Sequence, residues 1–166
     1  TLVCPTIGAA RDDLRRLRST ISRHAERYGL APIAASCHPF SDWKQQQHTD
    51  KERYHGLERD LAGVARRLLI CGCHVHVGVE SDDQGIAAID RIRVWLPVIL
   101  AISANSPFHD GGDTGYASYR SQLWMRWPSA GPTDTFGTPD AYHELVRSMV
   151  ESGVLLDDGI IYFDAR

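Results

Sequence analysis

Apolar residues recur at intervals of three and four in two long segments of the chain. In residues 14–28 this repeat predicts an amphipathic helix with a basic opposite face, and Gly29 is the expected stop. Acidic residues alternate with the arginines of that face, so we interpret it as solvated and not as a phosphate site. In residues 54–68 a second apolar stripe predicts another amphipathic helix.

Two further helices are predicted mainly from their start signals. The run Glu80-Ser81-Asp82-Asp83 supplies a capping hydroxyl and negative charge for a helix that is expected to bend or break near Pro97. Thr138-Pro139 followed by Asp140 predicts the last helix, which Gly153 should end.

Short apolar and alternating segments predict the strands. Residues 30–36 suit a packed strand, and residues 159–164 are predicted to form the last one. From Cys71 to Val79, glycine and histidine would line one strand face while cysteine and valine line the other. Helices and strands together predict one α+β unit, although their alternation does not fix the order of strands in a sheet.

Composition narrows the class of protein. The chain has 166 residues, 43% hydrophobic and 23% charged, with a formal net charge of −3, as in one globular domain large enough to bury a core. This balance argues against a nucleic-acid partner. The longest apolar run, Trp95 to Ile102, is far shorter than the roughly 20 residues of a membrane helix. Because no secretory signal opens the chain, we predict a cytoplasmic protein without a membrane partner.

The cysteines and the chain ends add two expectations. The spacing of Cys71 and Cys73 suits neither a redox pair nor a zinc knuckle, so we interpret the cysteines as small buried thiols. The chain starts at Thr1 and stops at Arg166, each next to a strand-like pattern, so we expect a piece of something longer. Unpaired strand edges invite association, and homo-oligomer formation is therefore part of the prediction.

The candidate chemistry begins with His74 and His76, which would share one strand face between two glycines. A metal ion or an anionic group could approach such a face closely. The alternative is a pair of structural histidines on a half-buried strand. His38 follows the short apolar segment, where it could reach into a site or only cap the strand.

Arginine and tryptophan are interleaved farther along, at Arg120, Trp124, Arg126 and Trp127. Guanidinium groups beside indole rings suit bidentate capture of a carboxylate or phosphate. The alternative is a structural cation–π ladder.

The end of the chain carries another polar row. Alternation would place Tyr162, Asp164 and Arg166 on one strand face. The glycine-rich acidic run from His109 to Gly115 could wrap a ligand, but surface turns have the same composition.

Six motifs follow one another along the chain: Cys37-His38-Pro39-Phe40 with Trp43; Glu52-Arg53-Tyr54; Gly72-Cys73-His74-Val75-His76-Val77-Gly78; Ser103-Ala104-Asn105-Ser106-Pro107-Phe108; Ser118-Tyr119-Arg120 with Trp127-Pro128 and Gly131-Pro132; and Tyr162-Phe163-Asp164-Ala165-Arg166. Together they resemble the bacterial carboxylate–amine ligases of the glutamate–cysteine ligase type 2 family. The resemblance covers nearly the whole chain and identifies residues 1–166 as the central part of a single ligase catalytic domain.

The resemblance implies a fold similar to glutamine synthetase and glutamate–cysteine ligase. In that fold a curved, mostly antiparallel sheet forms a trough for ATP and metal ions, with helices on its outer face. This chain would hold only part of the trough, because the family's N-terminal acidic strand and a further strand after residue 166 do not occur in it. Activity is therefore expected of the parent protein.

The implied reaction uses ATP and Mg²⁺ to activate a carboxylate as an acyl phosphate, which an amine such as that of cysteine then attacks. Small amino acids are the implied substrates. Cations must neutralise the stacked negative charge. We expect the metal at His74 and His76, and nucleotide contacts from His76 and Arg166. The catalytic residues would be Arg120, Arg126 and Asp164, and substrate would contact His38, Arg120 and Trp127.

Two other functions remain open. A zinc-dependent hydrolase would use His74 and His76 with a third ligand such as His38 or His109. A non-catalytic binding module of the same fold would bind ligands without turnover.

Overall fold

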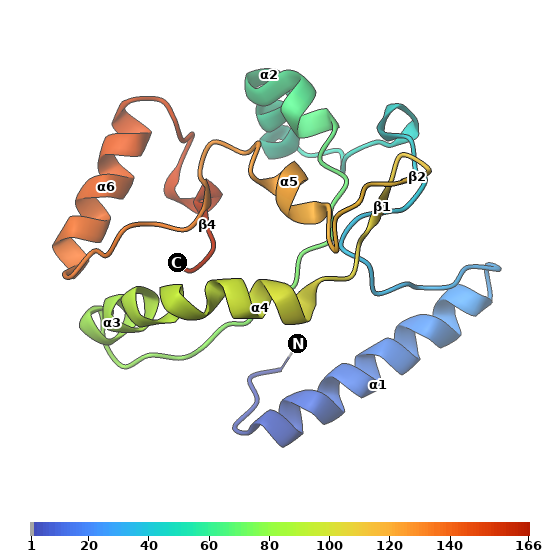
Figure 1. Ribbon diagram of the computed structural model, residues 1–166, viewed down its shortest axis with the longest axis horizontal. Coiled ribbons are helices and arrows are strands. Elements are labelled where there is room, and N and C mark those ends of the chain that lie inside the picture. Colours follow the sequence, from blue (N-terminus) through green and yellow to red (C-terminus); the bar gives the residue numbers. More distant parts are fainter. Residues whose placement is uncertain (1) are drawn as a thin grey trace. The chain divides into compact units, whose positions relative to one another are not determined.

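The computed structural model describes residues 2–166, which form helices and a few short strands (Figure 1). The chain divides into two compact units, Thr1–Ala34 and Ala35–Arg166. The assignment of residues 1–166 to one catalytic domain stays a prediction. Within residues 2–166, no helix combines the length and the apolar character needed to cross a membrane.

The first unit is built on one helix, α1 (Ile7–Glu26). Thr6 begins it, because its hydroxyl accepts the backbone N–H of Ala9 at 3.1 Å. Gly29 follows the helix with a φ of +66°, a left-handed conformation typical of glycine after a helix end. The predicted helix and its stop are thus confirmed.

The predicted strand over residues 30–36 is wrong, because no ladder forms there. An apolar segment becomes a strand only when a second backbone accepts and donates its hydrogen bonds. Here the pairing amounts to one isolated antiparallel bridge just beyond the segment, between Cys37 and Ile70.

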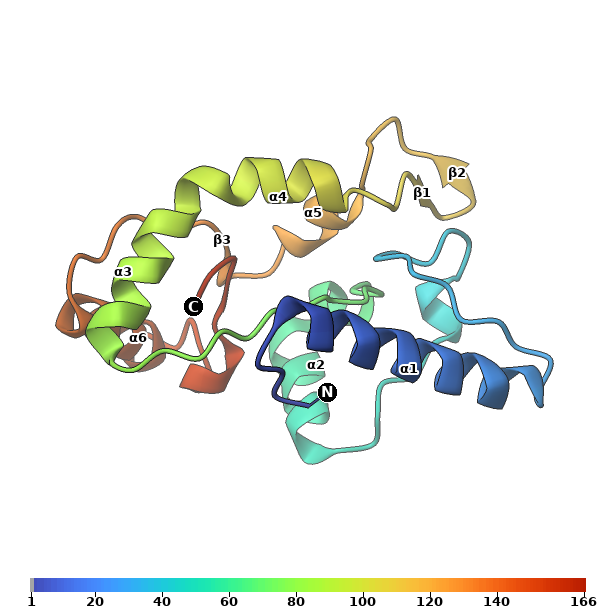
Figure 2. The ribbon, with the colours of Figure 1, turned by 90° about the horizontal axis from the view of Figure 1, so that it is seen from below.

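The second unit opens with η1 (Trp43–Gln45) and α2 (Glu52–Arg66), followed by α3 (Asp82–Ile92), η2 (Arg93–Trp95) and α4 (Leu96–Ser103). Ser81 caps α3 by accepting the Gln84 backbone N–H at 3.2 Å, as its position predicts. Figure 2 shows α3 and α4 following one another with a bend between them, and Pro97 lies in the first turn of α4. The predicted bend is confirmed.

A tight hairpin follows α4. Strands β1 (Phe108–His109) and β2 (Gly112–Asp113) pair antiparallel. Asp110 and Gly111 connect them with φ values of 50° and 76°, as a two-residue turn with two left-handed positions requires.

The last third of the chain contains α5 (Arg120–Trp124), β3 (Ala130–Gly131), α6 (Pro139–Glu151), η3 (Asp158–Ile160) and β4 (Tyr162–Phe163). The Thr138 hydroxyl caps α6 by accepting the Ala141 N–H at 3.3 Å, which confirms the predicted start. Strands β3 and β4 pair in parallel.

The core of the second unit joins α2, the α5–β3 turn, α6 and the C-terminal segment. Its buried members are Leu57, Trp127, Val146, Leu155, Ile160 and Ile161. Ser129, which is buried beside them, donates its hydroxyl to the Ile160 carbonyl at 2.9 Å.

The α+β class is confirmed, but a curved antiparallel sheet is not shown. The strands within residues 2–166 form one antiparallel and one parallel sheet, each with two strands. Residues 71–79, predicted as a strand, carry no ladder and are exposed. Cys71 and Cys73 are therefore exposed thiols and not buried ones, whereas Cys37 is buried.

Candidate functional site

Arg120 lies at the start of α5 against an aromatic cluster. Its guanidinium carbon is 5.3 Å from the Trp124 ring centroid. Trp124 stacks on Trp127, with centroids 6.4 Å apart. Tyr162 meets both indoles edge-on, at 5.0 and 5.2 Å. Two segments about 35 residues apart in the sequence thus form one ring cluster beside a cation.

The parallel pairing of β3 and β4 brings the C-terminal segment, residues 162–166, to this cluster. Beyond the paired residues, the Asp164 N–H donates to the Gly131 carbonyl at 3.0 Å. The Arg166 guanidinium lies 5.2 Å from the Tyr162 ring centroid and donates to the Ile161 carbonyl. Arg166 thus packs on Tyr162, but β4 ends at Phe163, so the predicted strand face shared by Tyr162, Asp164 and Arg166 stays a prediction.

The positive charge of Arg120 acts on two ionisable groups whose pKa values are shifted, Asp164 and Cys37. Burial raises the pKa of the Asp164 carboxyl above its ordinary value of 3.8, and the charge of Arg120 opposes that shift. Burial likewise raises the pKa of the Cys37 thiol, again opposed by Arg120. A carboxyl with a raised pKa beside an arginine is suited to exchange a proton near a bound anion.

Cys37 links this region to the His38 motif. The buried Ser106 hydroxyl accepts the backbone N–H groups of Ser36 at 2.8 Å and Cys37 at 3.1 Å. His38 Nδ1 accepts the Ser41 N–H at 3.0 Å, so one ring nitrogen caps the following turn. Its Nε2 is the atom that could meet a substrate.

Trp127 occupies the core, with 7% of its surface exposed. It holds Trp124 and Tyr162 in place from the inside. A substrate would meet the exposed parts of those neighbours before it met Trp127.

The two predicted arginines face different surroundings. Arg126 is exposed and lines an open pocket of about 470 Å³ together with Arg67 and Leu123. Arg67 in turn stacks on the Trp43 ring, 5.2 Å from its centroid. The sequence interpretation missed Arg67. Two features could have indicated this contact: Arg67 lies at the end of the helix predicted over residues 54–68, and Trp43 belongs to the motif before that helix.

His74 and His76 lie on the exposed segment 71–79. Their ring centroids are 6.1 Å apart. Within residues 2–166, three metal-ligating side chains converge in one group, and that group contains neither His74 nor His76. His38 and His109, the third ligands considered for a zinc hydrolase, are not members of that group either.

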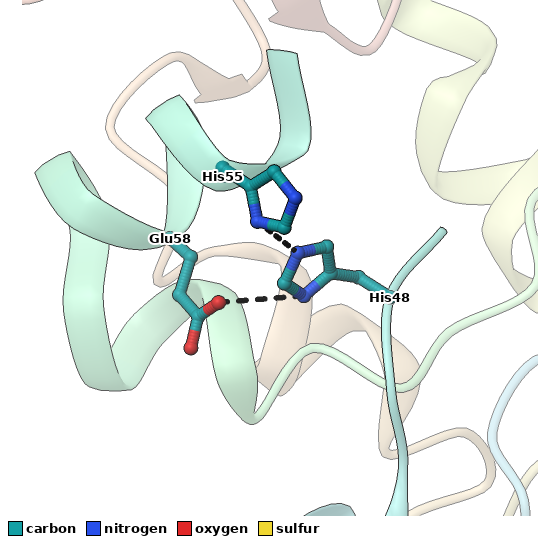
Figure 3. Close-up of side chains that lie close together, drawn as sticks. All are labelled: His48, His55 and Glu58. Atoms are coloured by element: carbon teal, nitrogen blue, oxygen red, sulfur yellow. Dashed lines mark hydrogen bonds and ion pairs between the residues drawn. The ribbon is translucent and has the colours of Figure 1, made fainter. Parts of the chain in front are cut away.

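That group consists of His48, His55 and Glu58, which the sequence interpretation missed (Figure 3). One ligand atom from each lies within 4.8 Å of the other two. The available signal was the spacing of His55 and Glu58, because residues three apart on a helix lie on one face.

Comparison with known proteins gives one consistent family. Residues 1–166 match the family model for glutamate–cysteine ligase family 2 (GCS2). A Streptomyces avermitilis protein named "Putative glutamate--cysteine ligase 2-1" is 49% identical over 93% of this chain and 42% of its own length. A Jannaschia protein named "Putative glutamate--cysteine ligase 2" is 46% identical over 100% of this chain and 44% of its own. The chain thus spans less than half the length of these relatives.

Proposed function

This chain belongs to the glutamate–cysteine ligase family 2, and we propose that the full-length protein is an ATP- and Mg²⁺-dependent carboxylate–amine ligase. Its substrates would be glutamate or a similar acid and the amine of cysteine or a similar amino acid. The observation that carries this proposal is the family match over residues 1–166, together with relatives whose names describe a ligase.

The proposed reaction has two steps. A carboxylate oxygen attacks the terminal phosphorus of ATP, and the bond to ADP breaks. The amine then attacks the acyl carbon, the bond to phosphate breaks, and the ammonium proton is transferred to a base. Both steps bring anions together, so positioned cations supply most of the stabilisation.

Arg120 and Asp164 fit the centre of such a site. Arg120 would hold the substrate carboxylate and later the acyl phosphate, because its guanidinium is positioned on Trp124. Asp164 would take the proton from the attacking amine, since burial raises its pKa and makes it a better base. In this proposal Trp127 contributes by supporting Trp124 and Tyr162.

The other predicted residues would surround this centre. Arg166, packed on Tyr162, would contact nucleotide phosphate. Arg126, on the pocket with Arg67, would hold a second anionic group. His38 would contact substrate through Nε2.

Mg²⁺ would neutralise phosphate charge when bound, but the donors beside His74 and His76 do not fit it by themselves. Mg²⁺ prefers oxygen ligands, and within residues 2–166 these histidines belong to no group of three ligating side chains. We therefore propose them as nitrogen donors to a metal site whose carboxylates come from elsewhere in the full-length protein. There residues 71–79 and 159–164 would join a curved, mostly antiparallel sheet, in a cytoplasmic enzyme.

The decisive experiment incubates the full-length protein with ATP, Mg²⁺, an acidic amino acid and an amine-bearing one. We expect release of ADP and phosphate that requires both amino acids, and an amide product of the corresponding mass. Hydrolysis of an amide without ATP would favour the zinc hydrolase. Nucleotide binding without turnover across a panel of amino acids would favour the binding module.

A further inference from the structure

Two histidine rings face each other at the start of α2. His48 lies in the irregular segment before the helix, and His55 lies in its first turns. The His48 Nε2 and His55 Nδ1 atoms are 3.1 Å apart, and Figure 3 shows His48 positioned between His55 and Glu58. The facing nitrogens therefore come from two segments of different backbone structure.

A carboxylate lies behind each ring. Asp50 Oδ1 is 2.8 Å from His55 Nε2, and Glu58 Oε2 is 3.4 Å from His48 Nδ1. The other Glu58 oxygen pairs with Arg66 Nε at 2.8 Å, which fixes the carboxylate. In metal sites, a carboxylate commonly accepts the outer N–H of a ligating histidine and orients the ring.

Proton counting shows what the pair lacks. A neutral imidazole carries one N–H and one lone pair. If His55 donates Nε2–H to Asp50, its Nδ1 presents a lone pair to His48. A neutral His48 can then donate to His55 or to Glu58, but not to both. A second proton on His48 or a metal ion between the rings removes this conflict. With a metal ion, both inner lone pairs bind it while both outer N–H groups donate to carboxylates.

The spacing also fits. Two nitrogens bound tetrahedrally to zinc at about 2.0–2.1 Å are about 3.4 Å apart, close to the 3.1 Å between His48 Nε2 and His55 Nδ1. The side chains of His48, His55 and Glu58 remain 38%, 45% and 32% exposed, so an ion and its water ligands can reach them.

We propose that His48 Nε2 and His55 Nδ1 bind a divalent transition-metal ion of the zinc class, with Asp50 and Glu58 as positioning residues. Nitrogen donors select such an ion over Mg²⁺. The ion would fasten the segment before α2 to the helix, where the N-cap residue Lys51 makes no side-chain capping bond. This metal clip is separate from the ligase chemistry and does not depend on it.

The chain offers competing donors in the exposed pairs Cys71 with Cys73 and His74 with His76. The test therefore uses full-length protein in a background that carries C71S, C73S, H74A and H76A. Zn²⁺ is titrated calorimetrically into this background, and into versions that add His48→Ala, His55→Ala or Asp50→Asn. His143→Ala, on the exposed surface of α6, is the matched control.

We expect the background protein and the His143→Ala control to bind one zinc equivalent that millimolar Mg²⁺ does not displace. His48→Ala and His55→Ala should each lower the affinity for that zinc ion at least tenfold, and Asp50→Asn should lower it about 10- to 100-fold. Zinc should also raise the melting temperature of the background but not of His55→Ala, while circular dichroism confirms that every variant folds. Failure of the folded background to bind this equivalent, or unchanged binding in folded His55→Ala, would overturn the proposal.

Discussion

Arg53 and Asp157 form a two-pronged ion pair across 104 residues, with Nη1 3.3 Å from Oδ2 and Nη2 3.2 Å from Oδ1. Asp157 Oδ1 also accepts the Gly159 N–H at 2.8 Å and caps η3. One carboxylate thus ties the start of α2 to the segment that leads into β4. The proposed site residues Asp164 and Arg166 follow directly after this segment.

Arg53→Lys should lower the free energy of unfolding by about 0.5–1 kcal/mol, because lysine keeps the charge but loses the fork in a half-exposed pair. Urea denaturation measures the change. Arg59→Lys on the same helix is the control, since Arg59 meets Asp60 only at 3.9 Å. Equal effects of the two substitutions would show that the fork adds nothing.

Ser129→Ala should be more costly, because Ser129 is 2% exposed and its hydroxyl donates to the Ile160 carbonyl. The substitution leaves a buried acceptor without this donor, which costs about 1–3 kcal/mol of unfolding free energy. Ser148→Ala, on the exposed surface of α6, should change it by less than about 0.5 kcal/mol. Chemical denaturation of both variants checks this, and a neutral Ser129→Ala would mean that another group satisfies the carbonyl.

Asp90 predicts a pH dependence of stability. Its carboxylate accepts the backbone N–H groups of Phe136 and Gly137, each at 2.8 Å, and these bonds lower its pKa below the ordinary 3.8. Because folding favours the ionised form of Asp90, this carboxylate contributes to stability above pH 3.8. That contribution is lost as the pH falls through the pKa of Asp90 in the folded protein.

Asp90→Asn should therefore lower the melting temperature at pH 7, because asparagine cannot offer two anionic acceptors. The difference from the original protein should shrink as the pH falls below 3.8. Thermal melts across pH 2.5–7 measure it, with the exposed Asp134→Asn as control. A difference that stays constant across this range would contradict the assignment.

The helix ends could be predicted from the sequence because their rules are local. Thr138 and Ser81 cap helices with their own hydroxyls, and Gly29 ends one with its own backbone. Each decision involves residues within about four positions, so a pattern in one stretch contains all the information.

The strands and the site depend on partners far along the chain. Residues 71–79 alternate as a strand should, yet the neighbouring hydrogen bond, from Cys71 N–H to the Ser36 carbonyl, crosses 35 residues. The ring cluster forms because β3 pairs with β4, which no local pattern specifies. The position of His48 beside His55 could not be predicted, because His48 lies in an irregular segment where no periodicity assigns its side chain to a face.

Arg120→Lys tests the proposed anion site in the full-length protein. Lysine keeps the charge but loses the planar fork, which should cost about 1.5–3 kcal/mol of binding, or roughly 10- to 150-fold in kcat/KM for amide formation. Arg91→Lys, on the exposed surface of α3, is the control. Unchanged steady-state kinetics would show that Arg120 packs on Trp124 without binding substrate.

His74→Ala separates a chemical role from a structural one, because residues 71–79 are exposed and carry no ladder that the substitution could break. The variant should fold with an unchanged melting temperature. If His74 serves the metal site in the full-length ligase, ATP-dependent amide formation should still fall at least about 100-fold.

A titration of Mg²⁺ distinguishes the cause of this loss. Weakened metal binding would appear as partial recovery of activity at high Mg²⁺, whereas activity lost for another reason would not recover. His24→Ala on α1 controls for the removal of an exposed histidine. Near-normal turnover of His74→Ala at saturating Mg²⁺ would remove His74 from the site and leave Arg120 and Asp164 as its proposed centre.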